Sequence, residues 1–246
     1  MNPYRERHYR HRVRTDRLTG FRVAVEETDL MVHADQDFTT DTRDAVVQCR
    51  SILESYLAGH PEWLTSLVPV DLTSPAPDLI REMAAAARSA GVGPMAAVAG
   101  AIAEQVGRRL LKRSKEVIVE NGGDTFVSCR SPVTMAIFAG RSPLSMRVGL
   151  KLPPSPRPVA VCTSSGTVGH SLSRGRADAA CVLSDSCALA DAAATAIGNR
   201  VAAPADIAAA IDFGRTIGGV DGVVVISGDQ MGLWGRLEVV PLGKMG

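Results

Sequence analysis

The chain has 246 residues, of which 22% are charged, 46% hydrophobic and 4% aromatic, and its formal net charge at pH 7 is +1. This length predicts one large domain over residues 1–246, or two small intertwined subdomains, and the composition excludes disorder, collagen and coiled coil. The near-zero net charge gives no global electrostatic argument for nucleic-acid binding, and ten aromatic residues are few for a base-stacking surface.

A basic segment, residues 1–17, opens the chain with six arginines and two histidines. Within it Tyr9, His11 and Val13 alternate with arginines, as residues on one face of an edge strand do. This pattern favours a solvated or edge strand. Two alternatives stay open: contact with a ligand phosphate, and binding of nucleic acid. We expect no nucleic-acid partner.

The cysteines and the apolar runs indicate the compartment. Five cysteines are an odd number and none stands in a C-x-x-C arrangement, so we expect reduced core residues rather than disulfides or a zinc site. The arginine-rich start is unlike a signal peptide, and the longest apolar run is far shorter than the ~18 residues of a membrane span. We therefore expect a cytoplasmic protein without membrane contact.

The first half of the chain predicts one hairpin followed mainly by helices. Turn residues separate two alternating runs, and three later stretches have apolar residues at helical spacing. The expected elements are strands over 21–27 and 30–34 turning at Thr28 and Asp29, and helices over 40–58, 77–90 and 94–113.

From Glu116 onward, short β-rich runs bounded by Gly, Pro, Ser or Asn are typical of strands. The expected strands span 117–120, 125–129, 133–138, 146–152, 159–162 and 177–183. Two helices, over 188–197 with Ser186 as its cap and over 204–217, precede a terminal hairpin of 223–227 and 233–240. Because helices and strands come in blocks, and no regular βαβ alternation occurs, we expect an α+β fold with largely antiparallel sheets.

Three polar segments carry residues that folding alone does not demand. The first is Glu120-Asn121-Gly122-Gly123-Asp124, directly after an apolar strand. Two glycines let the backbone approach a ligand or adopt positive φ, and the flanking carboxylates can bind a ribose hydroxyl, a metal or a cationic group. A plain glycine hairpin turn explains the segment equally well.

The second segment is rich in hydroxyls and glycines around one histidine. Its candidate ligand-binding residues are Thr163, Ser164, Ser165, Gly166, Thr167, Gly169, His170 and Ser171. Short donors and exposed amides suit phosphate oxygens, and His170 is available as acid, base or ligand. It is neither a Walker loop nor a Gly-x-Ser-x-Gly motif, and a flexible surface loop is the alternative.

The third segment is the helix that contains Asp191 and Thr195. Their four-residue spacing projects both oxygens from one helical face, as a sparse Mg²⁺ site with substrate phosphates and waters would use them. The alternative places Asp191 near a positive helix N-terminus and bonds Thr195 back to the preceding turn.

Taken together, these motifs resemble a known family. The runs that carry the resemblance are 92–100, 120–124, 163–173 and 190–199, with 28–30 and 60–63. They resemble uncharacterised protein family 0280 over nearly the whole chain, and that family is similar in fold to the ApbE-like superfamily. The resemblance implies an α+β, ApbE-like fold with intertwined mixed or antiparallel sheets and packed helices.

The superfamily includes Mg²⁺-dependent transferases that cleave FAD and place FMN on a protein threonine. By resemblance, 121–124 match its Gly-Gly-Asp turn, 163–166 its Thr-Ser-Gly step and His170 its histidine, while Asp191 and Thr195 match its metal ligands. His170 and Asp124 are the candidate catalytic residues. The chain reads Ala99-Gly100 where those transferases have a Lys-Gly pair, and 171–175 replace their Asp-Pro-x-x-Gly.

The resemblance thus implies binding of a flavin (FAD or FMN) or another phosphate-bearing ligand with Mg²⁺, and transfer of a flavin or nucleotidyl group to a protein acceptor. One alternative is a binding protein without turnover. The other is a subunit of a homo-oligomer whose alanine-rich helices serve assembly.

Overall fold

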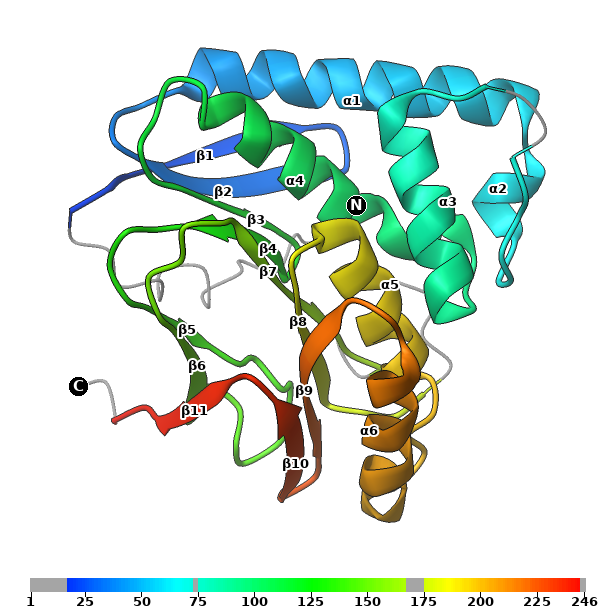
Figure 1. Ribbon diagram of the computed structural model, residues 1–246, viewed down its shortest axis with the longest axis vertical. Helices are drawn as coiled ribbons and strands as arrows, with labels where there is room; N and C mark the ends of the chain where they lie inside the picture. The colour runs from blue at the N-terminus through cyan, green and yellow to red at the C-terminus, as the bar shows by residue number, and fades with distance from the viewer. Residues whose placement is uncertain (1–16, 73–74, 167–174, 244–246) are drawn as a thin grey trace.

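The computed structural model describes residues 17–72, 75–166 and 175–243 and arranges them in three layers (Figure 1). Helices cover one face of a large sheet, and a small sheet covers part of the other face. Every pairing between the described strands is antiparallel. The expected α+β class is therefore confirmed.

The two sheets take strands from the whole length of the chain. The larger has eight strands in the order β1 (Thr19–Val25), β2 (Thr28–Ala34), β3 (Val117–Asn121), β4 (Asp124–Ser128), β7 (Val159–Ser164), β8 (Ala179–Ser184), β9 (Val220–Ser227) and β10 (Gln230–Gly235). The smaller has the order β11 (Glu238–Pro241), β6 (Val148–Leu152) and β5 (Val133–Ala136).

The helices follow the expected blocks. They are α1 (Thr39–Gly59), α2 (Glu62–Thr65), α3 (Asp78–Ala90), α4 (Val98–Leu110), α5 (Cys187–Gly198) and α6 (Ile207–Thr216), with 3₁₀ turns η2 (Pro94–Ala97) and η3 (Pro204–Asp206). Among the described residues, no helix combines the length and apolarity that crossing a membrane requires.

Alternating side chains of the large sheet enter two separate cores. On β3, Val117 and Val119 pack under the helices, whereas Ile118 packs toward the small sheet. On β7, Cys162 faces the helices and Val161 the small sheet. Because both faces are covered, these strands read as continuous apolar runs in the sequence.

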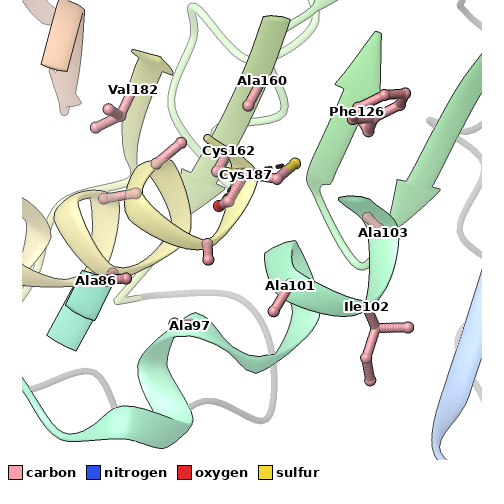
Figure 2. Close-up of a cluster of buried hydrophobic side chains, with 14 of the residues drawn as sticks. Ala86, Ala97, Ala101, Ile102, Ala103, Phe126, Ala160, Cys162, Val182 and Cys187 are labelled. Atoms are coloured by element: carbon pink, nitrogen blue, oxygen red, sulfur yellow. Dashed lines mark hydrogen bonds between the residues drawn. The ribbon is translucent and has the colours of Figure 1, made fainter. Parts of the chain in front are cut away.

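Helix α5 lies at the centre of the helical layer, where its alanines are completely buried. Figure 2 shows its first residue, Cys187, beside Cys162 of β7, with alanines of α3 and α4 nearby. A Cβ on Gly100 would lie 2.3 Å from the Cys187 carbonyl oxygen, and one on Gly107 would lie 2.2 Å from the Phe126 ring. Small residues thus let the helices approach each other and the sheet closely.

The first hairpin turns earlier than the sequence indicates. Thr28 and Asp29 belong to β2, and the turn consists of Glu26 and Glu27, with Glu26 at φ 52°. The expected turn at Thr28 and Asp29 is wrong because Arg22 of β1 binds the Asp29 carboxylate at 2.8 Å, which satisfies a buried acid inside the strand.

The terminal hairpin also differs from the expectation. Its turn has only two residues, Gly228 and Asp229, and the single strand expected over 233–240 is divided between β10 and β11 of different sheets. Gly235 makes this division: it has φ +99°, and a Cβ there would lie 2.2 Å from the Asp221 carbonyl oxygen. Only glycine fits such a bend.

Candidate functional site

The Glu120–Asp124 segment forms a tight turn between β3 and β4. Asn121 pairs with Asp124, and Gly122 and Gly123 between them have φ of 70° and 115°. The Gly123 amide donates to Glu120 Oε1 at 2.8 Å, and the Asn121 side chain donates to the Ala99 carbonyl at 3.0 Å. The glycine pair is thus a strand break, and its polar neighbours hold it against the start of α4.

Asp191 of α5 also reaches the start of α4. Its Oδ2 accepts a hydrogen bond from the Gly100 amide at 2.9 Å, and the Ala99 amide contributes a second. The carboxylate therefore caps α4, whose first amides have no partner within the helix. This bond also explains why the helix expected over 94–113 starts as a 3₁₀ turn, because the amides of Ala99 and Gly100 bond Asp191 instead of continuing the helix back to Pro94.

The structure brings Asp124 and Asp191 together in a buried pair. Burial is the main cause that raises the pKa of Asp124 well above its usual value; the charge of Asp191 raises it further, and a hydrogen bond from the Cys162 thiol opposes the rise. Burial likewise raises the pKa of Asp191 to about 7, against the two α4 amides. None of the salt bridges among the described residues involves either carboxylate.

The hydroxyl-rich segment is described as far as Gly166. The Thr163 hydroxyl contacts the Cys181 thiol at 3.1 Å, while its backbone amide donates to Asp124. Gly166 donates to the Ala177 carbonyl at 2.9 Å. The remaining candidates of this segment, Thr167, Gly169, His170 and Ser171, lie outside the described residues.

The stems of this segment meet at the end of α5. A Cβ on Gly166 would lie 2.0 Å from the Gly175 carbonyl oxygen, and a Cβ on Gly175 would lie 1.9 Å from the Gly198 carbonyl oxygen. The three backbones are thus stacked in direct contact. Thr195, one turn before Gly198 in α5, is half-buried.

Two contacts of this region were not predicted from the sequence. Gly100 supplies the amide to Asp191, and Cys162 donates its thiol to Asp124. A glycine inside an alanine-rich helix was the available signal for the first, whereas a strand cysteine gives none. The expectation of core cysteines is confirmed: all five are free and buried.

The alanine-rich helix α5 is packed inside the chain. Its alanines, from Ala188 to Ala196, are at most 1% exposed and pack inside the chain. They are therefore core residues.

The fold is that of ApbE-type flavin transferases. The apo flavinyl transferase ApbE from Pseudomonas stutzeri superposes with a TM-score of 0.60 at 15% identity, covering 89% of this chain and 94% of that one. The flavin transferase ApbE from Vibrio cholerae gives 0.50 at 12% identity, covering 89% and 96%. At such identities the likeness defines the fold alone.

Sequence similarity then defines the family. The model of the family described as "AbpE bacteria" matches residues 10–231, and the chain belongs to this family. A UPF0280 protein from Methanocella arvoryzae is 44% identical over 217 residues, 88% of each chain. Another from Methanocaldococcus jannaschii is 38% identical over 230 residues, 91% of this chain and 93% of the relative.

Proposed function

We propose that this protein binds a flavin nucleotide, FAD or FMN, together with Mg²⁺, at the meeting point of the Glu120–Asp124 turn, the Thr163–Gly166 stem and α5. The observation that carries the proposal is the buried pair Asp124 and Asp191. Burying two neighbouring carboxylates costs free energy unless a proton or a cation compensates their charge. A divalent cation held by Asp191 would supply that compensation.

The donor set fits Mg²⁺. Among the described residues no group of three or more His, Cys, Asp or Glu side chains could hold a metal by itself. Mg²⁺ does not need one, since it commonly keeps several waters and uses one or two protein carboxylates with substrate phosphates. Asp191 accepts from the Gly100 amide with Oδ2; its other oxygen and the Thr195 hydroxyl are the proposed ligands.

The other residues of the site have separate roles in the proposal. The turn glycines allow the ligand close to the backbone, and Glu120 and Asn121 hold the turn in place. Asp124, whose raised pKa keeps a proton available, is the proposed acid or base, with His170 as the second candidate. When bound, Mg²⁺ would neutralise phosphate charge and polarise the phosphoryl oxygens.

The proposed reaction is transfer of a flavin or nucleotidyl group to a protein acceptor in the cytoplasm, by analogy with the named activity of the structural neighbours. Binding without turnover is the second candidate. The specific observation in its favour is that Ala99-Gly100 stands where the flavin transferases have Lys-Gly, and here these two residues supply amides to Asp191.

The deciding experiment measures ligand binding and turnover separately. An absorbance scan of the purified protein detects co-purified flavin, and thermal shift with FAD, FMN or ATP, with and without Mg²⁺, measures binding. Chromatography of AMP released from FAD measures turnover. Stabilisation by flavin that needs Mg²⁺ supports the proposal, and AMP release selects turnover over binding alone.

The variant Asp191→Asn tests the metal ligand. An asparagine oxygen still accepts from the Gly100 amide, so the apo fold should persist while Mg²⁺-linked stabilisation is lost. Thr195→Ser should be mild because the hydroxyl remains, and Asp44→Asn, at an exposed carboxylate of α1, is the control. Full Mg²⁺-linked binding in Asp191→Asn would contradict the metal assignment.

A further inference from the structure

The strand β10, at one edge of the large sheet, has a composition that permits pairing with another strand. Its residues, Gln230 to Gly235, include no charged side chain and no proline. At the opposite edge β1 carries Arg22, a charge of the kind that blocks strand addition. Figure 1 shows β10 on the outside of the sheet, beside α6.

One face of β10 exposes large apolar side chains. Met231 is 36% and Leu233 51% exposed. They pair in register with Ile226 and Val224 of β9, which belong to the core under the small sheet. The small sheet thus covers β9 on this face and leaves the two β10 side chains accessible.

The other face of β10 borders a groove of about 520 Å³ against α6. Gly232 lies on this face, since a Cβ there would be 2.5 Å from Ile207 of α6. The residues that line the groove include Ala208 and Asp212 of α6 and Gln230 and Trp234 of β10. Exposed Ala208 has a small side chain, which lets another helix come close.

From this edge we infer that β10 is a homodimer interface, in which two copies of the chain pair β10 with β10 in antiparallel orientation about a twofold axis at Gly232. Ser227 and Gln230 close the two-residue turn, so alternation along the strand turns the backbone groups of Met231, Leu233 and Gly235 away from β9. The axis at Gly232 places Met231 opposite Leu233 of the second copy, on the same face.

The charges at the two ends of β10 favour a second copy of the chain as the partner, in antiparallel orientation. Asp229 stands at one end of β10 and Arg236 at the other. Arg236 binds Asp221 of its own copy at 2.7 Å through Nη2, but its side chain is still 80% exposed, which leaves donors for a second carboxylate. Antiparallel pairing brings Asp229 of each copy beside Arg236 of the other, at both ends of the interface. A parallel pairing would place like charges together. Across the same axis the two α6 helices lie side by side, and each covers the other's groove.

The first test is the oligomeric state of the full chain at about micromolar concentration, a range that separates specific dimers from weak encounters. Sedimentation equilibrium should show a dimer for the native chain. Leu233→Lys, at an exposed position, should raise the dissociation constant at least tenfold while the chain stays folded. Leu64→Lys, at a leucine of α2 that is 60% exposed, is the matched control and should leave the dimer intact.

Charge reversal tests the orientation. Asp229→Arg alone should weaken the dimer, and addition of Arg236→Asp should restore it in part. Hydrogen exchange should protect the amides of Met231 and Leu233 in the native dimer and expose them in Leu233→Lys. A monomeric native chain, a dimer disrupted by Leu64→Lys instead, or a foreign or N-terminal peptide found on β10 by native mass spectrometry would each overturn the inference.

Discussion

Helices α4 and α5 cap each other with buried carboxylates, and the two caps differ in their surroundings. Glu104 of α4 accepts from the Cys187 amide at 2.8 Å and is paired with Arg108 at 2.6 Å. Asp191 of α5 accepts from the Gly100 amide at 2.9 Å, yet its charged neighbour is Asp124, a second acid. The first cap is electrostatically complete. The second cap needs a proton or a cation. This difference separates Glu104, a structural carboxylate, from Asp191, a candidate metal ligand.

Gly100→Val should have the largest effect because it breaks the helix crossing that both caps share. Its Cβ would lie 2.3 Å from the Cys187 carbonyl oxygen, within the backbone of α5. We expect a loss of about 3 kcal/mol in the free energy of unfolding, measured by urea denaturation. Gly59→Ala, where no heavy atom lies within 4 Å of the added Cβ, is the control. A loss below about 1 kcal/mol would mean that the crossing can relax.

Glu104→Ala should have the next largest effect. It leaves the Cys187 amide buried without an acceptor, which should cost about 2–3 kcal/mol. Glu82→Ala removes another partner of Arg108 but leaves the cap, and serves as control. Equal losses in the two variants would show that Glu104 acts only through its ion pair.

The pH dependence of stability reports on the other cap. Burial raises the pKa of Asp191 from 3.8 to about 7, so the folded chain keeps a proton that the unfolded chain has released. Stability of the metal-free protein should therefore fall as pH rises from about 4 to about 7. Asp124→Asn, which removes a second buried acid with a raised pKa, should flatten this fall in melting temperature, and Asp44→Asn should not. A native profile that rises over this window would contradict the buried pair.

Arg108→Ala should have the smallest effect. It removes the counter-charge of Glu104, so that neither cap has a cationic partner. Because the Arg108 side chain is 54% exposed, water can replace part of its interaction, and we expect a loss of about 1 kcal/mol. In a double-mutant cycle with Glu104→Gln, the cost of losing Arg108 should shrink, because the neutral amide needs no counter-charge. If Arg108→Ala costs the same free energy of unfolding in the Glu104→Gln background, Arg108 acts through contacts other than Glu104.

Local signals predicted much of the fold. Ser186 accepts from the Leu189 amide as the expected cap of α5, and Gly91 ends α3 with φ 70°. The Gly122-Gly123 break was likewise visible, because successive glycines leave few alternatives to a turn. Such features depend on residues close together in the sequence.

The site depended on contacts that local patterns do not contain. The spacing of Asp191 and Thr195 predicts a shared helical face, but not that Asp191 bonds Gly100, which lies 91 positions earlier. The start of α4 and the division of the terminal hairpin were missed for the same reason. Each is decided by backbone atoms distant in the sequence.

The glycine stack at the end of α5 holds two positions of the chain, Gly166 and Gly175, at one point of the fold. Because these two ends are already in contact, a longer sequence between them adds little closure entropy, about 0.6 kcal/mol for a doubling of its length. Evolution, or an engineer, can thus vary the chemistry offered at this end of α5 while both sheets keep their register.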